Sequence, residues 1–204
     1  MEYVEDGRSA RRERNRDAVI DALVELTTEG NDEPSIEEIA ERAGVSYRSV
    51  YRYFGDRTAM MDAATDRAMA WLQPKLINAA GPVMIGEPLG ARLDSIITSR
   101  LDMYEQVADM VRATTVRAFS NRRIDNVFIN ARSVTRSQIG QRFSTELDEY
   151  DEAERQVRIS AMDHAMTFQA IDYFRHEREH SREQVAGHLD RTLRSALASG
   201  EVGA

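Results

Sequence analysis

Apolar residues recur along this chain every three or four positions, which is the spacing of helices that each bury one face. The pattern predicts helices over residues 12–29, 35–43, 46–54, 56–74, 91–118, 124–147, 151–174 and 181–199. Two prolines and three glycines crowd residues 81–90, so we predict a loop there. We therefore expect an all-α fold that divides at this loop.

Two of the predicted helices are short and lie close together in the sequence. Ser35 begins a capping-box pattern at the start of the first helix, and Gly44 suits its end because glycine enters a left-handed conformation without steric cost. Ser46 is a suitable cap for the second helix. A small residue at Ala40 lets the two helices cross closely, and Val50 fills the gap between them. This arrangement predicts a helix-turn-helix.

The second short helix carries basic and aromatic residues on its predicted outer face. These residues are Tyr47, Arg48, Ser49, Arg52 and Tyr53. Such side chains suit phosphates and the base edges of a major groove. A helical hairpin with a solvated charged face fits the same spacing, so the pattern alone leaves both interpretations open.

The formal net charge of −8 at first argues against a nucleic-acid partner. Salt screens charges that are more than about 8–10 Å apart, however, so the placement of charges matters more than their sum. The arginines at 8, 11, 12, 14 and 16 oppose only Glu13, and those at 42, 48, 52 and 57 oppose only Asp56 within residues 42–57. Local basic patches on an acidic protein are compatible with reversible DNA binding.

The N-terminal third resembles the DNA-binding domain of TetR-family transcriptional regulators. The matching segments are RDAVIDALVELTTEG, IEEIAERAGVSYRSVYRYFGDR and TAMMDAATDRAM, and the resemblance covers roughly residues 14–70. It implies a three-helix helix-turn-helix DNA-binding domain at 11–55, a connecting helix at 56–80 and a helical ligand-binding and dimerisation domain at 81–204. Residues 1–10 are expected to form a flexible basic arm.

The helix-turn-helix and the resemblance together assign the DNA contacts. They are Ser35, Ser46, Tyr47, Arg48, Ser49, Tyr51, Arg52, Tyr53 and Arg57. We expect Ser35 to present a helix N-terminus to a phosphate. Arg48 is the residue we expect to bond guanine, a contact worth about 1–3 kcal/mol of discrimination. Tyr51, Tyr53 and Arg57 resemble the family's backbone clamps, which position the protein without reading sequence.

The resemblance also implies a homodimeric repressor that binds a pseudo-palindromic double-stranded DNA operator and is released by a small-molecule effector. Methionines and aromatic residues could line an adaptable effector pocket, although a plain core is the alternative. The candidates are Met103, Tyr104, Met110, Phe119, Phe128, Met162 and Met166. A narrow apolar stripe on the last helix is expected at the dimer interface. The assigned interface residues are Tyr173, Val185, Leu189, Leu193 and Leu197.

Composition excludes several other classes of protein. The longest uncharged run, residues 76–86, is too short to span a bilayer, and the N-terminus lacks the apolar core of a secretory signal. The absence of cysteine excludes disulfides and thiolate metal sites. We therefore expect a cytoplasmic protein without membrane contact, metal or cofactor.

Two rival functions remain open at this stage. His176 and His180 match the zincin pattern H-E-x-x-H, so a helical zinc hydrolase is a remote alternative, but no third ligand is evident and we expect no enzyme. The other rival is a DNA-binding or protein-interaction module without a ligand. Residues 112–142 hold seven arginines and one acid, and residues 146–183 hold eleven acids. The arginines therefore either contact an anionic effector or neutralise the neighbouring acidic helix.

Overall fold

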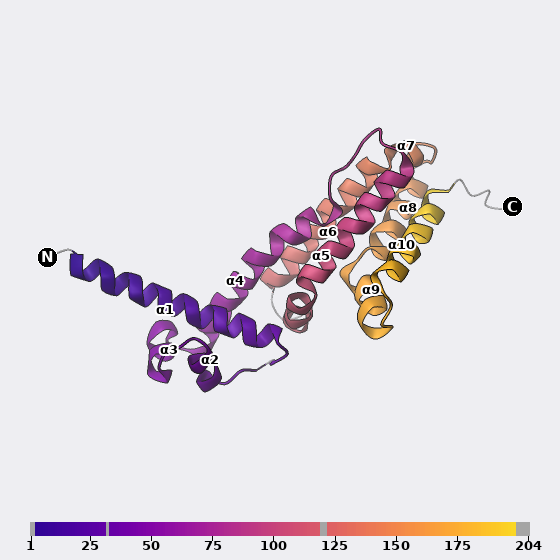
Figure 1. Ribbon diagram of the computed structural model, residues 1–204. Helices are drawn as coiled ribbons and strands as arrows, with labels where there is room; N and C mark the ends of the chain where they lie inside the picture. The colour runs from indigo at the N-terminus through magenta and orange to yellow at the C-terminus, as the bar shows by residue number, and fades with distance from the viewer. Residues whose placement is uncertain (1–2, 32, 119–121, 199–204) are drawn as a thin grey trace. The chain divides into compact units, whose positions relative to one another are not determined.

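The structure is a computed structural model that describes residues 3–31, 33–118 and 122–198. Within these residues it contains helices and no strand, so the predicted all-α fold is confirmed (Figure 1). The helices are α1 (Tyr3–Thr28), α2 (Ile36–Arg42), α3 (Tyr47–Phe54), α4 (Arg57–Ile77), α5 (Leu89–Ala118), α6 (Arg122–Arg142), α7 (Ser144–Leu147), α8 (Glu152–Ala165), α9 (Phe168–Asp172) and α10 (Arg182–Leu197). A 3-10 turn, Asn78–Ala80, follows α4, and a π-helical segment, Tyr173–Glu177, follows α9.

The chain forms two compact units, each with its own hydrophobic core. The first unit comprises the described residues of 1–72 and 109–125, and the second comprises those of 73–108 and 126–204. The boundary between the units passes through α4 rather than through the loop at 81–90, where we predicted it. The functional division at residues 10, 55 and 80 stays a prediction.

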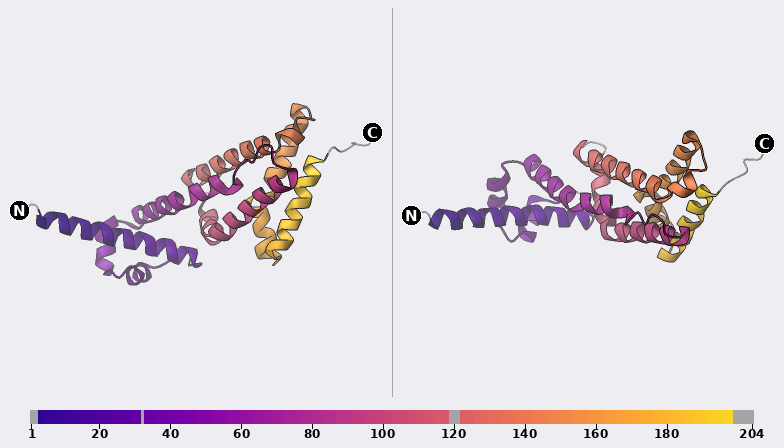
Figure 2. Two further views of the ribbon diagram at one scale, coloured as in Figure 1. Left: turned by 45° about the horizontal axis from the view of Figure 1, so that its top comes forward. Right: turned by 90° about the horizontal axis from the view of Figure 1, so that it is seen from above.

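The helix-turn-helix lies in the first unit, where α2 and α3 pack against α1 (Figures 1 and 2). The Ser35 backbone donates to the Glu38 carboxylate at 2.7 Å, and the Ser35 hydroxyl accepts from the Glu38 backbone at 3.2 Å, which confirms the predicted capping box. Gly44 has a φ of +65°, so the tight turn needs a residue without a Cβ. Ala40 and Val50 are buried between the helices, as the sequence predicted.

Helix α1 begins at Tyr3 and therefore includes most of the segment that we predicted as a flexible arm. The apolar periodicity starts only near residue 19, so the pattern could not reveal the earlier helical turns. Alanine, arginine and glutamate dominate residues 8–16, and these residue types favour a helix even without a buried face. The first helix therefore begins about nine residues earlier than the expected start near residue 12.

Helix α4 continues three residues past Pro74, where we expected an end or a kink. Proline removes one backbone hydrogen bond, which here is the bond to the carbonyl of Ala70. Ala70 is exposed, so the loss of this bond does not leave a polar group in the core. Chain direction changes instead at Gly81, whose φ is +63° and where a Cβ would lie 2.4 Å from the Ser99 hydroxyl.

Two buried arginines hold the loop before α5 against helices α5 and α6 of the same unit. Arg142 donates to the backbone carbonyls of Ala80, at 2.6 Å, and of Pro82, and also to that of Arg92 at 3.0 Å. Arg92 in turn donates to the Arg142 carbonyl and to the Glu146 carboxylate. These bonds join three segments that are distant in sequence and place the Glu146 carboxylate against the Arg92 guanidinium.

The pH dependence of stability tests the role of Glu146. The Arg92 hydrogen bond lowers the pKa of Glu146, whose side chain is only 20% exposed. A lowered pKa in the folded state means that the stabilisation is complete above the unfolded value of about 4.5 and is lost as the pH falls through the folded value. We expect Glu146→Gln to lower the free energy of unfolding by about 2 kcal/mol at pH 7, because the charge-assisted bonds to the buried Arg92 are lost.

Urea denaturation at pH 7 and at pH 3.5 measures this effect. The difference in unfolding free energy between wild type and Glu146→Gln should shrink at the lower pH, because the unfolded chain binds a proton at Glu146 below about 4.5 while the folded chain resists it. Glu154→Gln is the matched control, because Glu154 pairs with Arg158 on the surface and contributes less than about 1 kcal/mol. Equal losses in both variants would contradict a special role for Glu146.

The segment 151–174, predicted as one helix, consists of α8 and α9 with a break at Met166 and Thr167. Asp151 caps α8 as predicted. Thr167 caps α9, because its hydroxyl accepts from the Ala170 backbone at 3.2 Å. The threonine hydroxyl can bond the backbone in place of a helical carbonyl, so a helix can end and restart at this residue. The apolar periodicity continues on both sides of Thr167, and for this reason the sequence pattern did not predict the break.

Candidate nucleic-acid interface and ligand cavity

Helix α3 presents its N-terminal turn to solvent. Ser46 caps the helix by accepting from the Ser49 backbone at 3.3 Å, and Val50 anchors it in the core with 2% exposure. Tyr47 and Tyr51 are exposed and contact each other, with ring centroids 5.1 Å apart. The local caps and one buried residue therefore fix the helix while its polar face remains outside.

Arg48 lies on this exposed face. Within the described part of the chain, its guanidinium has no hydrogen bond or ion-pair partner. Arg52 is also exposed and donates to the Ser49 hydroxyl at 3.4 Å. Arginine donors that the protein itself does not use are available to base edges or phosphates.

Tyr53 differs from its predicted outward position. The side chain is half-buried against the core of the first unit, and its hydroxyl accepts from the Asn15 amide at 3.2 Å. This hydrogen bond lowers the pKa of Tyr53. Phe54 is likewise half-buried against this core, and its ring centroid lies 5.0 Å from the Arg16 guanidinium carbon.

A basic groove of about 420 Å³ lies between α1 and the N-terminus of α3. The groove is lined by Arg8, Arg11, Arg12, Asn15, Gly44, Val45, Ser46, Ser49, Arg52 and Tyr53, and among the described side chains this set contains four arginines and no acid. Four of the predicted contacts, namely Ser46, Ser49, Arg52 and Tyr53, thus lie beside arginines of α1 that we had assigned to a flexible arm or to no site. Their spacing of three and four residues would have indicated one helix face if the helix had been extended to residue 8.

Ser35 and Arg57 lie together at the start of α2. Arg57 donates to the Pro34 carbonyl at 3.1 Å. The Ser35 hydroxyl and backbone both bond the Glu38 carboxylate, and these bonds lower the pKa of Glu38. A negative charge therefore occupies the N-terminus where we predicted a phosphate contact, so this geometry does not favour Ser35 as a phosphate ligand.

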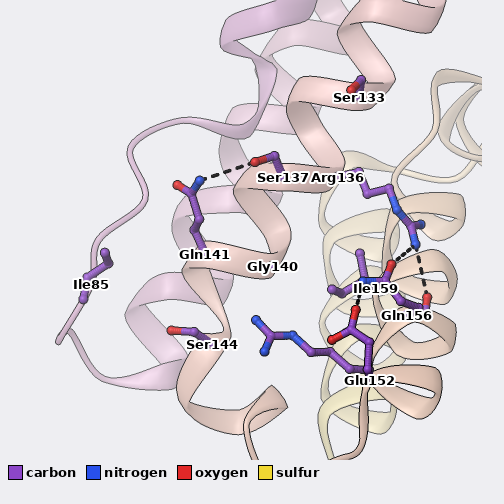
Figure 3. Close-up of a pocket in the computed structure, with 11 residues that line it drawn as sticks. Ile85, Ser133, Arg136, Ser137, Gly140, Gln141, Ser144, Glu152, Gln156 and Ile159 are labelled. Carbon is purple, nitrogen blue, oxygen red and sulfur yellow. Dashed lines mark hydrogen bonds between the residues drawn. The ribbon is translucent and has the colours of Figure 1, made fainter.

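A groove of the second unit runs between α6 and α8 (Figure 3). Its volume is about 680 Å³, and eight of its eleven lining residues are polar or charged. Arg136 donates across it to the Ser160 hydroxyl at 2.8 Å and to the Gln156 amide oxygen at 2.6 Å. None of the predicted ligand residues lines this groove.

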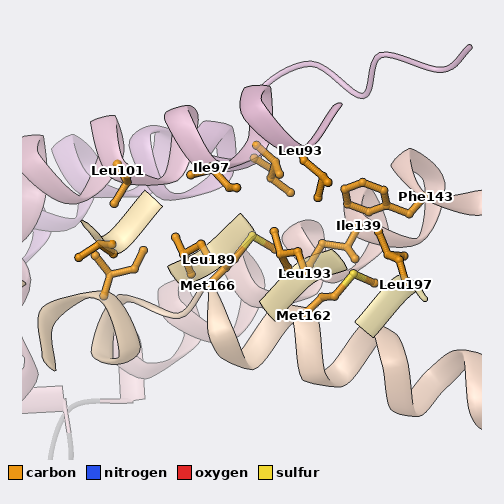
Figure 4. Close-up of a cluster of buried hydrophobic side chains, with 14 of the residues drawn as sticks. Leu93, Ile97, Leu101, Ile139, Phe143, Met162, Met166, Leu189, Leu193 and Leu197 are labelled. Carbon is orange, nitrogen blue, oxygen red and sulfur yellow. The ribbon is translucent and has the colours of Figure 1, made fainter. Parts of the chain in front are cut away.

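A smaller cavity of about 50 Å³ lies among α4, α5, α6, α8 and α9. Three of the predicted ligand residues line it, namely Met103, Phe128 and Met166. Tyr104 and Met162 are instead buried in the core cluster, where Tyr104 donates to Asp172 at 2.8 Å (Figure 4). The residues that face this cavity are therefore only part of the set expected from the sequence.

Two other predicted ligand residues fall outside the cavity. Met110 belongs to the first unit, where the Thr28 hydroxyl lies 3.8 Å from its sulfur. Phe119 lies outside the described residues. Methionine and aromatic content alone could not separate pocket from core, because both environments use the same side chains.

The predicted dimer residues require a correction. Val185, Leu189, Leu193 and Leu197 are buried in the core of their own unit, at 0–6% exposure, together with residues of α5, α6 and α8 (Figure 4). They are therefore not available to a second subunit. Tyr173, the fifth member of the set, is 44% exposed. The narrow stripe on α10 indicated an internal face, not an intersubunit face.

The arginines of residues 112–142 divide among several kinds of partner. Arg112 pairs with Asp109 at 3.6 Å, and Arg136 bonds the neutral Ser160 and Gln156. Arg142 bonds backbone carbonyls. Arg132 and Arg136 also act through space on Asp163 of the acidic segment, so the described arginines combine neutralisation with bonds to neutral groups. The side chains of Arg117, Arg122 and Arg123 lie outside the described residues.

The two histidines of the zincin pattern do not share a helix face. His176 belongs to the π-helical segment that ends at Glu177, and Glu179 has a φ of +53°, so no continuous α-helix connects the histidines. His180 stacks on Phe174 with ring centroids 5.6 Å apart. Across residues 3–31, 33–118 and 122–198, no three His, Cys, Asp or Glu residues form a group suited to a metal ion. In the same ranges, no helix is long and apolar enough to cross a membrane.

Comparisons with known proteins agree with this architecture. Residues 19–64 match the family model described as bacterial regulatory proteins of the tetR family. A TetR-family transcriptional regulator from Streptomyces coelicolor superposes with a TM-score of 0.63 at 23% identity, covering 90% of this chain and 80% of that one. A transcriptional regulator from Rhodococcus sp. Rha1 superposes with a TM-score of 0.59 at 19% identity, and the superposition covers 95% of this chain and 99% of that one. No curated protein matches the sequence.

The all-α fold and the exposed helix α3 define a DNA-binding transcriptional regulator of the helix-turn-helix class. The matched segment contains the end of α1, all of α2 and α3, and the start of α4. Residues 19–64 therefore carry a DNA-binding domain of the tetR family.

Proposed function

We propose that the protein is a homodimeric repressor that binds a pseudo-palindromic operator and is released by a small-molecule effector. The observation that carries the proposal is the exposed N-terminal turn of α3, where Arg48 has no partner within the described residues, beside a groove lined by four arginines. In a symmetric dimer, two such helices reach major grooves about one helical turn, or a multiple of it, apart.

The contacts divide into two kinds in this proposal. Tyr47, Arg48 and Ser49 face base edges from the first turn of α3 and set sequence preference. Arg8, Arg11, Arg12 and Arg52 meet phosphates from the groove and set affinity and salt dependence. Tyr51 and Arg57 remain proposed backbone contacts, although Arg57 also supports the start of α2 through the Pro34 carbonyl.

The outer face of α8 is the surface that we now propose for dimerisation. Helix α8 packs its inner residues Ile159 and Met162 into the core, whereas Ala153, Val157 and Ala161 are exposed on the other side. Val157 is 62% exposed. Small apolar residues at a four-residue spacing allow close approach of a second helix, so α8 and α10 of two subunits would form a four-helix bundle.

We expect Val157→Arg to convert the dimer to a monomer and to weaken operator binding. Two arginines would face each other across the symmetric contact, where like charges and desolvation both oppose association. Sedimentation velocity over a range of protein concentrations measures the change, expected to be at least about a tenfold increase in the dissociation constant. Ile129→Arg on α6 is the control, because Ile129 is also exposed, at 52%. A dimer that persists in Val157→Arg contradicts this interface.

The runner-up function is a DNA-binding module without an effector. The small volume of the cavity in the second unit favours this alternative, because drug-sized ligands occupy about 300–1,000 Å³. Screening small molecules for release of a selected operator decides between the two functions. Release by any ligand that also binds the free protein supports the repressor, and a complete lack of effector response supports the module.

A further inference from the structure

The cavity in the second unit contains a buried arginine without a partner. Arg100, on α5, is 7% exposed, and in the part of the chain that the structure describes it makes no hydrogen bond or ion pair. Its Nε is completely buried. Burial lowers the pKa of Arg100 to about 10, so the group still carries its charge at neutral pH. The Asp163 carboxylate offsets part of this charge through space, but no described residue bonds the guanidinium. A buried charge without a bonded partner is costly, which indicates a role beyond stability.

The charges around Arg100 leave the cavity positive. Arg132, from α6, is exposed and lines the same cavity, and Asp163, from α8, is the one acid in its lining. Desolvation raises the pKa of Asp163 despite the neighbouring Arg100, Arg136 and Arg132. Asp163 favours the charged form of Arg100 through space, but in the described residues no hydrogen bond or ion pair within 4.0 Å joins the two side chains. Two arginines and one aspartate give the lining a formal charge of +1, which favours an anion.

The remaining walls are apolar, and the space is small. Met103, Phe128, Met166 and Phe168 contribute side chains to the lining. A volume of about 50 Å³ has room for roughly three or four water-sized groups, since one water needs at least about 10–15 Å³. The two methionines allow modest expansion, because their side chains are flexible.

We propose that this cavity binds a short carboxylate, whose oxygens pair with the Arg100 guanidinium and whose alkyl end lies against Met103, Phe128 and Phe168. A guanidinium matches the two oxygens of a carboxylate in a planar, bidentate arrangement. The inference rests on the proposed function, because it names the chemical class of the effector.

Titration of the DNA-free, full-length protein with sodium propionate tests this site, with propionamide as the neutral molecule of the same shape. Ionic strength is held constant with sodium chloride. We expect propionate, but not propionamide, to raise the thermal midpoint and to shift the NMR signals of the cavity methionine methyl groups. A dissociation constant in the millimolar range is expected, because five non-hydrogen atoms support limited binding energy. Equal responses to both molecules, or to neither, overturn the proposal.

The variant Arg100→Met separates a ligand site from a structural arginine. We expect propionate affinity to fall by at least about tenfold, whereas the thermal midpoint of the ligand-free protein rises by about 2 °C or more, because an unpaired buried charge is removed. Arg100→Lys should retain part of the propionate response. Arg136→Met is the control, because Arg136 is bonded to Ser160 and Gln156, and it should bind propionate normally. A lower midpoint in Arg100→Met, with unchanged propionate affinity, overturns the proposal.

Asp163→Asn provides an independent test. If Asp163 opposes the bound carboxylate, its neutral variant should bind propionate several-fold more tightly than wild type. If Asp163 instead serves as the counter-charge of Arg100, the variant would lose stability without gaining affinity, which overturns the proposal.

Operator binding is measured separately. Propionate binding by a protein that ignores DNA would reject the repressor and leave the cavity assignment intact, and the reverse result would reject only the cavity assignment.

Discussion

Replacing Arg48 by alanine is expected to reduce sequence discrimination strongly while leaving non-specific DNA affinity nearly unchanged. A bidentate contact between arginine and guanine provides about 1–3 kcal/mol of discrimination in each half-site. A symmetric dimer contains two such contacts. The difference between its binding free energies for specific and non-specific DNA should therefore shrink by about 2–6 kcal/mol. Arg48 is exposed and has no partner within the described residues, so its removal should not disturb the fold.

The comparison variant is Arg11→Ala in the basic groove. Its removal should weaken binding to all duplexes by a similar factor and should lower the dependence of log affinity on log salt by about one unit for each subunit. Arg57→Ala is a less suitable comparison, because it also removes the bond to the Pro34 carbonyl. If Arg48→Ala and Arg11→Ala change specificity and salt dependence alike, the assignment of reading and positioning roles is wrong.

Replacing Arg142 by methionine is expected to lower the free energy of unfolding by about 3–5 kcal/mol. The guanidinium donates to the carbonyls of Ala80, Pro82 and Arg92 and is 1% exposed. Each buried carbonyl that loses its donor costs about 1–3 kcal/mol, and entering water recovers part of this cost. Such a loss is a large fraction of the 5–15 kcal/mol that stabilises a typical protein.

Urea denaturation followed by circular dichroism measures the loss, and Arg136→Met serves as the matched variant. Arg136 is only half-buried, and its partners Ser160 and Gln156 can turn to water when it is removed. We therefore expect less than about 1 kcal/mol for Arg136→Met. A similar small loss in Arg142→Met would contradict the fastening of the 81–88 loop by this residue.

The helix-turn-helix could be predicted from the sequence because its determinants are local. The capping pair Ser35 and Glu38, the turn at Gly44 and the cap at Ser46 each depend on residues no more than four positions away, and each forms as predicted. Val50 follows from the same short pattern. The residue positions on the exposed face of α3 were therefore largely determined before any tertiary contact was known, with Tyr53 as the exception.

Features that depend on distant contacts could not be predicted in the same way. The stripe from Val185 to Leu197 has the same periodicity whether it faces its own core or a second subunit, and only the packing of α5, α6 and α8 against it decides between them. The burial of Arg100 and Arg142 could likewise not be predicted from the sequence, since arginine is normally a surface residue. The basic groove was not predicted, because the arginines of α1 that line it lie before the first apolar position of that helix.

Selection of bound duplexes from a random DNA pool tests the central claim most directly. The protein should enrich a two-fold symmetric sequence with half-sites separated by about one or more helical turns, and Arg48→Ala should no longer enrich it. A wild-type protein that enriches no sequence and binds no duplex even at low salt would contradict DNA recognition by the exposed helix α3.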